Sequence, residues 1–320
     1  MIIQKLGIYL GLSFCSLNAI AMEHLHQLIP AGPGGGLDGT ARESGRILSL
    51  LRAYETISYE NLPGGGGGRA LGQFIESSSR YRNATIINST PLIVRSLQGL
   101  FPYSYKDLEP IAGLVADYGI FVVRENDPIK DWKSLEKAFT DNPKSIITGG
   151  GSVRGSLDHI VLTLALEPIK VDPRDIRYLP YDGGAKAMLS LLGGEIRLLS
   201  SGVGETVPFL TGGKVRAIAV SAPKRIGIIP DVPTLTELGR EVVFANWRGI
   251  FANKNVSDIN RKILLDSYAA LKRSDAWEKV INQRGWQTLD VQGQKFAAYL
   301  ENQEKMLDST LRGLGFIKEQ

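Results

Sequence analysis

Residues 26–36 read HQLIPAGPGGG, and this stretch decides the fold class. A short apolar run ends at Ile29, and the residues from Pro30 to Gly36 form a glycine-rich turn. Beyond the turn, Leu37 and Ala41 fall on one helical face, as they do on an amphipathic helix. The stretch therefore predicts a strand, a turn and the start of a helix.

The same unit recurs three times along the chain. Residues 56–60 lead into Pro63 and five glycines, residues 145–148 into GGGS at 149–152, and residues 176–179 into YDGG at 181–184. Strands that alternate with helices favour mostly parallel sheets covered by helices on both faces. We therefore predict an α/β fold.

The order of these units also predicts two lobes. The chain of 320 residues has room for two domains of ordinary size. We expect residues 22–120 plus 244–320 to form lobe 1 and residues 121–243 to form lobe 2. The ligand cleft would then lie between the lobes, which two crossings of the chain would join.

The first 21 residues have the pattern of an export signal. Lys5 precedes the uncharged apolar residues 6–17, and Ala19-Ile20-Ala21 offers a small-x-small cleavage site before Met22. The apolar stretch is too short to cross a bilayer. We therefore expect a cleaved signal peptide and a soluble periplasmic protein, with lipidation at Cys15 as the alternative.

Composition removes several classes of function. The chain has 37 basic and 33 acidic residues, 3 histidines and 1 cysteine, and that cysteine lies in the signal. We therefore expect no metal site, no thiol chemistry and no disulfide. The charges are interspersed and form no basic stripe, so no nucleic-acid partner is expected. We expect a monomer.

Glycine loops that open helices are suited to binding anions. The first backbone N–H groups of a helix have no partner within it, and the helix dipole places positive charge there. Glycine lets the backbone approach a ligand closely. Several such loops that converge from two lobes would hold a carboxylate, phosphate or sulfate.

Two enzyme readings compete with this one. Residues 34–39 fit the G-x-G-x-x-G pattern of a dinucleotide fold, with Glu60 placed for a ribose, although Pro30 and Pro33 crowd the turn. Ser152, Asp158 and His159 suggest an exported α/β hydrolase, but the nucleophile elbow fails at Arg154. We expect no enzyme activity and no cofactor.

Ordered motifs across nearly the whole mature chain carry a more specific resemblance. They are IPAGPGGGLD at 29–38, NLPG at 61–64, GGS at 150–152 with DHI at 158–160, LLGG at 191–194, SGVGE at 201–205, GKVRAIAV at 213–220, PDVPT at 230–234 and NWRGIFA at 246–252. Together they resemble the tripartite tricarboxylate transporter receptors, or Bug family, and its tricarboxylate-type branch. The resemblance implies a type II periplasmic binding protein that delivers a small carboxylate, such as a di- or tricarboxylate, to permease subunits of a membrane transporter.

The resemblance also implies which residues hold the ligand, largely through backbone N–H groups. These are Gly34, Gly35, Gly36, Asp38 and Thr40 from lobe 1, and Gly151, Ser152, Tyr181, Gly183, Gly184, Ser201 and Glu205 from lobe 2. Ser89 and Thr90 could add hydroxyl groups or could simply form a turn. Asp38 could cap a helix, face the ligand, or do both. Arg216 and residues 246–248 are interpreted as hinge and packing residues.

Two residues depart from the family pattern. Arg154 stands where the branch usually has a small residue, and its forked guanidinium could pair with a second ligand carboxylate or lie in solvent. Asp182 places a negative charge next to a predicted anion site, which argues against citrate as the ligand. A binding module that serves a sensor instead of a transporter would have the same sequence features.

Overall fold

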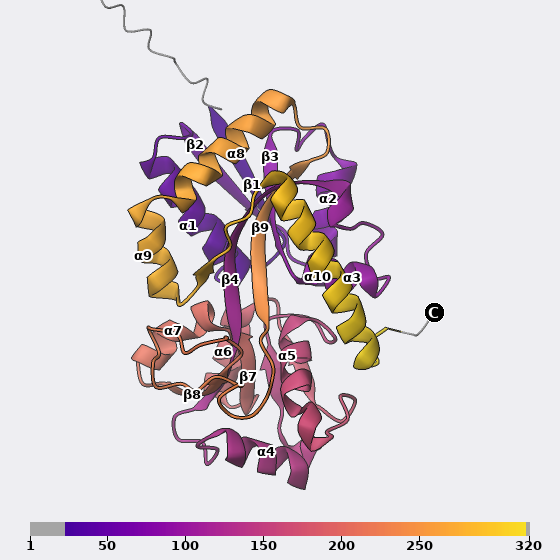
Figure 1. The fold of residues 1–320 in the computed structure, drawn as a ribbon, viewed down its shortest axis with the longest axis vertical. Coiled ribbons are helices and arrows are strands. Elements are labelled where there is room, and N and C mark those ends of the chain that lie inside the picture. Colours follow the sequence, from indigo (N-terminus) through magenta and orange to yellow (C-terminus); the bar gives the residue numbers. More distant parts are fainter. Residues whose placement is uncertain (1–22, 318–320) are drawn as a thin grey trace, which may run out of the picture.

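The computed structural model describes residues 23–317, which form two α/β halves joined at a waist (Figure 1). The strands are β1 (His24–Ile29), β2 (Thr56–Asn61), β3 (Ala84–Ser89), β4 (Leu108–Arg124), β5 (Thr148–Gly150), β6 (Tyr178–Pro180), β7 (Leu198–Gly202), β8 (Val215–Val220), β9 (Ala245–Asn253) and β10 (Gln287–Thr288).

Helices cover the sheets in both halves. They are α1 (Gly36–Leu50), α2 (Gly68–Glu76), α3 (Pro91–Leu97), α4 (Trp132–Asp141), α5 (Leu157–Leu166), α6 (Gly184–Gly193), α7 (Val203–Thr211), α8 (Asp258–Lys272), α9 (Asp275–Arg284) and α10 (Gly293–Gly313). The single-turn 3₁₀ helices are η1 (Gly65–Gly67), η2 (Tyr105–Asp107), η3 (Pro143–Ser145) and η4 (Glu167–Ile169).

The strands follow the order β2-β1-β3-β9-β4-β7-β5-β6, and β8 and β10 both pair with β4. Strands of the glycine-loop units pair in parallel, β1 with β2 and β3, and β5 with β6 and β7. The α/β prediction is confirmed. The sheet is mixed, however, because β4 and β9 pair antiparallel with their neighbours.

Strand β4 is the element that joins the halves. Residues Leu108–Tyr118 pair with β9 in the upper half of Figure 1, and residues from Gly119 onward pair with β7 and β8 in the lower half. Strand β9 carries the chain back alongside it. Two neighbouring strands thus run through the waist, and their register places Asp117 opposite Asn246 and Val115 opposite Arg248.

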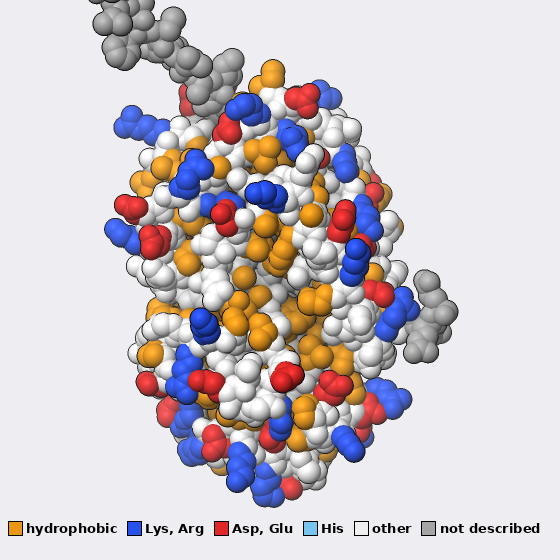
Figure 2. Space-filling model, in the orientation of Figure 1, with side chains coloured by type: hydrophobic (Ala, Val, Ile, Leu, Met, Phe, Trp, Pro, Cys, Tyr) orange, Lys and Arg blue, Asp and Glu red, His pale blue; other side chains and the backbone are white. Residues whose placement is uncertain are grey.

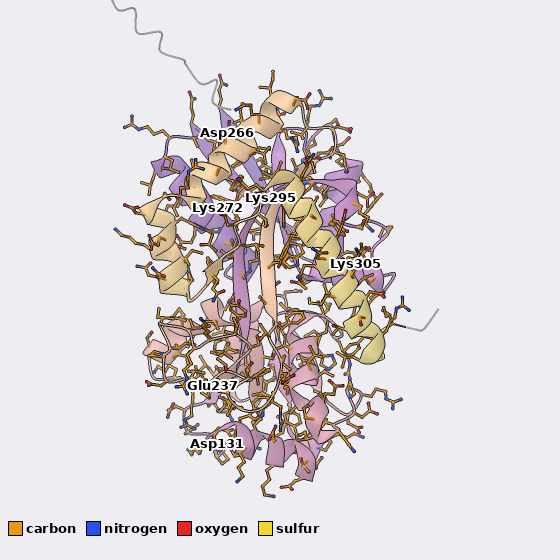
Figure 3. All side chains as sticks on the ribbon, viewed as in Figure 1. Asp131, Glu237, Asp266, Lys272, Lys295 and Lys305 are labelled. Carbon is orange, nitrogen blue, oxygen red and sulfur yellow. The ribbon has the colours of Figure 1, made fainter. Side chains whose placement is uncertain are left out.

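Apolar side chains fill both halves. In the upper half, Trp247, Phe251 and Phe296 pack ring against ring where α10 covers the sheet. In the lower half, Ile120, Met188 and Leu199 belong to a cluster between α6 and β4. Many charged side chains lie on the outside, as Lys305 on α10 and Asp131 at the start of α4 illustrate (Figure 3). Hydrophobic side chains also gather at the waist on the face drawn in Figure 2.

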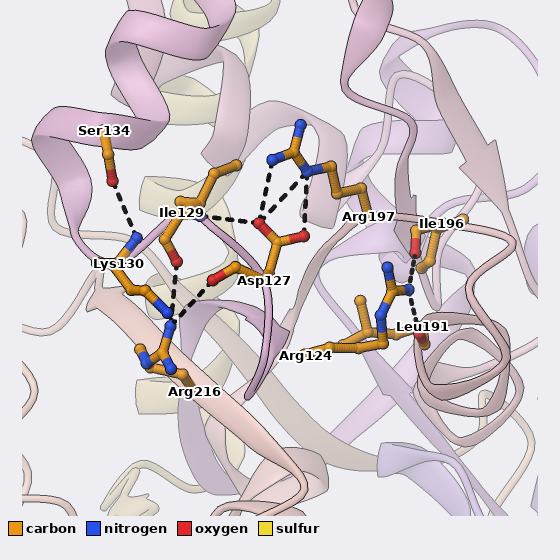
Figure 4. Close-up of polar contacts among 9 residues, drawn as sticks. All are labelled: Arg124, Asp127, Ile129, Lys130, Ser134, Leu191, Ile196, Arg197 and Arg216. Carbon is orange, nitrogen blue, oxygen red and sulfur yellow. Dashed lines mark hydrogen bonds and ion pairs between the residues drawn. The ribbon is translucent and has the colours of Figure 1, made fainter.

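A polar network fixes the far end of β4 in the lower half. Asp127 is buried and accepts from Arg197 Nε at 3.1 Å, and Arg124 Nη1 donates to the carbonyl of Leu191 at 2.9 Å. Arg216 donates to the carbonyls of Asp127 and Ile129 (Figure 4). Arg216 therefore fixes structure here, as its interpretation as a packing residue predicted.

Candidate functional site

A cavity of about 120 Å³ lies between the two halves. Its wall includes loops that precede α1, α2 and α3 in the upper half and α5, α6 and α7 in the lower half. Nine of the predicted ligand residues line it, namely Gly35, Gly36, Ser89, Gly151, Ser152, Tyr181, Gly183, Gly184 and Glu205. Loops that are far apart in the sequence are therefore brought together, as predicted.

Helices that begin at this cavity lack side-chain caps. The N-cap residues of α1, α2, α3, α5, α6 and α7 are Gly35, Gly67, Thr90, Ser156, Gly183 and Gly202, and none of them accepts a capping hydrogen bond. Away from the cavity, Asp131, Ser257 and Ser274 cap α4, α8 and α9. Backbone N–H groups at a helix start attract anions when no side chain satisfies them. Two of these groups already have side-chain acceptors from other positions, because Gly184 donates to Glu205 and Asp158 donates to Ser152.

Glycine allows the loops of the two halves to meet. A Cβ atom added to Gly35 would lie 3.5 Å from the Cα of Gly183 in the other half. Within the lower half, one added to Gly151 would lie only 2.3 Å from the backbone nitrogen of Gly184, so the α5 and α6 loops also meet closely. Gly183 also has φ of +102°, where a side chain is strained. The loops therefore contact each other through backbone, in a closed arrangement.

Asp38 holds the first loop and does not line the cavity. It is buried, and its carboxylate accepts from the backbone of Gly34, from Arg42 Nε and from Asn61 Nδ2, each at 2.9 Å. Burial acts to raise the pKa of Asp38, but the hydrogen bonds outweigh it and the pKa lies below its usual value. Asp38 is the third residue of α1, and the N-cap is Gly35. Gly34 likewise does not line the cavity.

A buried ion pair lies under the first loop. Arg248 on β9 donates from Nη2 to Asp117 Oδ2 at 2.6 Å, and from Nη1 to Thr40 Oγ1 at 3.1 Å. The Arg248 side chain is 2% exposed and that of Asp117 is fully buried. Arg248 borders the cavity, but Asp117 already pairs with its charge. Thr40 lies behind the wall and supports Arg248.

Glu205 is in the first turn of α7 and faces the cavity. Its Oε1 accepts from the backbone of Gly184 at 3.2 Å, and its Oε2 accepts from Ser201 Oγ at 3.2 Å. The backbone N–H of Gly36 acts to lower the pKa of Glu205. Burial raises the pKa of Glu205, with a further increase from the charge of Asp117, while Arg248 and these donors oppose the rise. Ser201 is therefore a support of Glu205 and not a wall residue.

Asp158 adds a second carboxyl group to the wall. Burial, together with the charge of Glu205, raises the pKa of Asp158 to about 7. The Ser152 hydroxyl accepts from the backbone N–H of Asp158 at 3.0 Å, and the hydroxyl of Tyr178 donates to the Ser152 carbonyl at 2.7 Å. Ser152 therefore ties the lower loop together while lining the cavity.

The remaining residues singled out from the sequence differ in whether they reach the cavity. Thr90 is buried outside the wall, and its backbone N–H donates to Asn246 Oδ1 at 3.3 Å. Arg154 is exposed and donates to the carbonyl of Ile176 at 3.3 Å, so the structure does not bring it to the cavity. Asp182 lines the rim, with its side chain 63% exposed and its carboxylate 3.9 Å from Lys186 Nζ.

Several wall residues were not selected from the sequence, although some lay in motifs that had been noticed. Gly66 and Gly67 come from the glycine run after β2, and Asp158 comes from the DHI motif. Ser156 and Asn88 carried no signal, because a lone Ser or Asn before or within an element is common in loops and caps. Ser156 Oγ is buried and has no hydrogen-bond partner among the described residues.

A sequence model of the tripartite tricarboxylate transporter family receptors matches residues 54–315. The chain belongs to this receptor family. A UPF0065 protein from the tcbD-tcbE intergenic region of Pseudomonas sp. (strain P51) is 27% identical over 245 residues, which are 74% of this chain and 70% of the relative. Protein BugT of Bordetella pertussis is 27% identical over 239 residues, 72% of this chain and 70% of BugT.

Solved structures of related fold agree with the architecture of this receptor. The periplasmic binding protein BugD has a TM-score of 0.83 at 24% identity, covering 92% of this chain and 99% of BugD. MatC of Rhodopseudomonas palustris with bound malate has a TM-score of 0.79 at 19% identity, covering 90% of this chain and 99% of MatC. An adipate-bound protein of R. palustris has a TM-score of 0.77, also at 19% identity, over 91% and 97%. These likenesses confirm the fold of a periplasmic binding protein.

Family membership confirms that the protein is a receptor and not an enzyme. The hydrolase reading also fails locally, because His159 Nδ1 accepts from the backbone of Gly155 at 3.1 Å and its ring packs 4.8 Å from that of Tyr178. Glu60, which the competing dinucleotide reading would assign to a ribose, contacts His26 and Arg80 outside the cavity. Within residues 23–317, no group of His, Asp or Glu side chains is placed to hold a metal.

The lengths and apolar character of the described helices show whether any of them could span a membrane. None of the helices within residues 23–317 combines the length and the apolar character needed to cross a bilayer. The expected signal peptide and Cys15 lie outside the described residues.

Proposed function

We propose that this protein is an exported receptor that captures a small carboxylate, a class that includes di- and tricarboxylates, and delivers it to the permease subunits of a tripartite transporter. One observation carries the proposal: helices from both halves begin at one cavity, and their own N-cap residues supply no side-chain cap. Each helix start favours an anion by about 0.3–1 kcal/mol when exposed, and by more when partly buried.

Capture would work by hinge closure. We assign residues 22–120 plus 244–320 to one lobe and residues 121–243 to the other, because the chain passes between the halves only along β4 and β9 within residues 23–317. A ligand that touches both lobes binds only the closed state and therefore stabilises it. Gly35 and Gly183, one from each lobe, would close over the ligand.

Related proteins support the choice of ligand class and role. The family is named for transporter receptors, and two proteins of similar fold hold malate and adipate. The family is also one of periplasmic receptors, in keeping with export by a cleaved signal at residues 1–21. We further propose that the protein acts as a monomer. Ser89 and Ser152 on the wall would add hydroxyl donors to the backbone N–H groups.

A thermal-shift screen of residues 22–320 against organic acids tests the function. A ligand at 100 times its dissociation constant adds about 2.7 kcal/mol of stability. We expect at least one carboxylate to raise the melting temperature, while the matched neutral amide does not. The proposal would be contradicted if no acid raised the melting temperature and mass spectrometry of the denatured protein detected no acid released from it.

The Gly151→Ala variant is the matched control for that screen. Its new Cβ would lie 2.3 Å from the Gly184 nitrogen and would push the α5 and α6 loops apart. Overpacking of this kind costs about 1–3 kcal/mol, so the variant should fold but lose the ligand-induced shift. If the ligand raises the melting temperature of Gly151→Ala as much as that of the wild-type protein, the ligand binds outside this cavity.

A further inference from the structure

The segment that follows α10 reaches from the upper half to the lower half. Helix α10 packs against β4 and α3, and its C-terminal end lies beside α5 (Figure 1). After it, Gly315 has φ of +70°, and the backbone N–H of Phe316 donates to the carbonyl of Leu311 at 2.8 Å. These are features of a Schellman turn, in which a left-handed glycine ends the helix. The turn carries Phe316 to the lower half.

Phe316 packs there against His159 of α5. The centroids of the two rings lie 5.2 Å apart, and the Tyr178 ring lies 4.8 Å from the other neighbouring position of His159. His159 is fully buried and Phe316 is half-buried. His159 Nδ1 accepts from the backbone N–H of Gly155 at 3.1 Å, which fixes the orientation of the ring. His159 thus presents an aromatic surface to a residue of the other half.

Gln98 makes a second contact between the halves. It is the C-cap residue of α3, and its Nε2 donates to the carbonyl of Gly155 at 2.7 Å. Arg95 Nη1 donates to Gln98 Oε1 at 3.2 Å and so orients the amide. A Cβ atom added to Gly155 would lie 3.0 Å from Gln98 Nε2 and 3.6 Å from the Phe316 ring. Both side chains of the upper half therefore contact the same loop of the lower half.

We propose that Gln98 and Phe316 of the upper half form a latch with Gly155 and His159 of the lower half, and that this latch stabilises the closed receptor independently of the ligand. The inference rests on the proposed function, because it concerns the hinge closure by which the receptor would capture its ligand.

The latch is outside the cavity but acts on a loop of its wall. Gly155 lies between Val153 and Ser156, which both line the cavity, whereas none of the four latch residues does. Opening the cavity draws this loop away from the upper half, so it breaks the contacts with Gln98 and Phe316. Because these contacts do not involve the ligand, they favour closure around every acid by the same factor.

The size of the effect follows from the contacts. An aromatic pair or one hydrogen bond changes a two-state equilibrium by about two- to tenfold. In a receptor that is mostly open without ligand, losing a contact raises every dissociation constant by this factor. In a receptor that is mostly closed without ligand, the same loss shifts the ligand-free protein toward the open form. Affinity and ligand-free shape together therefore detect the latch in either case.

The Phe316→Ala and Gln98→Ala variants test the latch. Calorimetric titration with butanedioate and with propane-1,2,3-tricarboxylate would measure affinity, and small-angle X-ray scattering without ligand would measure the radius of gyration. We expect each variant to weaken the binding of both acids by one common factor of about two to ten, or to expand the ligand-free protein. The control is Met306→Ala, which shortens a side chain that is 44% exposed on α10 and should match the wild type in both measurements.

Urea unfolding would confirm that both variants are folded, and the use of two substitutions on separate elements keeps the test valid if one of them fails to fold. Wild-type affinity together with a wild-type radius of gyration in a folded variant of each residue would overturn the inference. A loss confined to one acid would also overturn it, because it would make the residue a ligand contact.

The two proposals fail in different ways. If the wild-type protein binds organic acids but neither variant differs from it in affinity or shape, the receptor function stands and the latch is wrong. If no acid binds the wild-type protein while both variants have a larger radius of gyration than the wild type, the latch stands and the proposed function is wrong.

Discussion

Replacing Arg248 by methionine removes one partner of the ion pair at the waist. The Arg248 side chain is 2% exposed, and its Nη2 lies 2.6 Å from the fully buried Oδ2 of Asp117. Without Arg248, Asp117 keeps the backbone N–H of Gly204 at 3.2 Å as a donor. Its charge would have no counter-ion in direct contact. Breaking a buried pair in this way costs about 3–5 kcal/mol.

Urea unfolding followed by circular dichroism would measure the loss. For a chain of this length, each kcal/mol corresponds to about 2 °C in melting temperature, so a fall of about 6–10 °C accompanies it. Adding Asp117→Asn should recover most of the stability, because no charge is then left without a partner. Arg174→Met removes an ion pair with Asp172 that is exposed and should leave the midpoint unchanged. A loss below about 1 kcal/mol for Arg248→Met would refute the reasoning.

Three further perturbations follow from the site. Between pH of about 4 and 7, the raised pKa of Asp158 makes the folded state hold a proton that the unfolded chain releases, so stability falls as pH rises. Burial lowers the pKa of His159 to about 4, so between about 4 and 6.5 it has the opposite effect. The Asp158→Asn variant keeps only the His159 effect, so its urea midpoint should rise with pH up to about 6.5. The His159→Gln variant keeps only the Asp158 effect, so its urea midpoint should fall with pH up to about 7. Parallel pH curves for the two variants would contradict these shifts. Gly183→Ala forces a side chain to φ of +102° and should cost about 1–3 kcal/mol in urea unfolding, whereas Gly193→Ala, with open space around it, should cost nothing. Arg154→Ala should leave the calorimetric affinity for mono- and dicarboxylates unchanged, because the side chain lies outside the cavity, and a loss specific to dicarboxylates would restore it as a ligand.

Much of the fold could be predicted from the glycine-loop units. The strand and turn around Gly35 have a local pattern that packing does not override, and four such units indicate an α/β fold with parallel strands. The antiparallel pairing of β4 with β9 could not be predicted in the same way. It depends on which strands cross the waist, and that is decided by tertiary contacts between segments more than 100 residues apart.

The structure brings the predicted glycines of several loops to the cavity wall, whereas some predicted side chains turn away from it. Gly35, Gly151 and Gly184 line the cavity because their conformations are encoded by local sequence. Asp38 and Thr40 follow Gly35 closely, in the first residues of α1, yet they turn inward toward Asn61 and Arg248. Those partners arrive from distant strands, so no local pattern reveals which way these side chains point.

The most direct test of the account is a crystal structure of residues 22–320 with the acid that raises the melting temperature most. The account predicts that its carboxylate lies between the two halves, within hydrogen-bonding distance of loop N–H groups from both. An acid bound to one half only, or outside the cavity lined by Gly35 and Gly183, would contradict it.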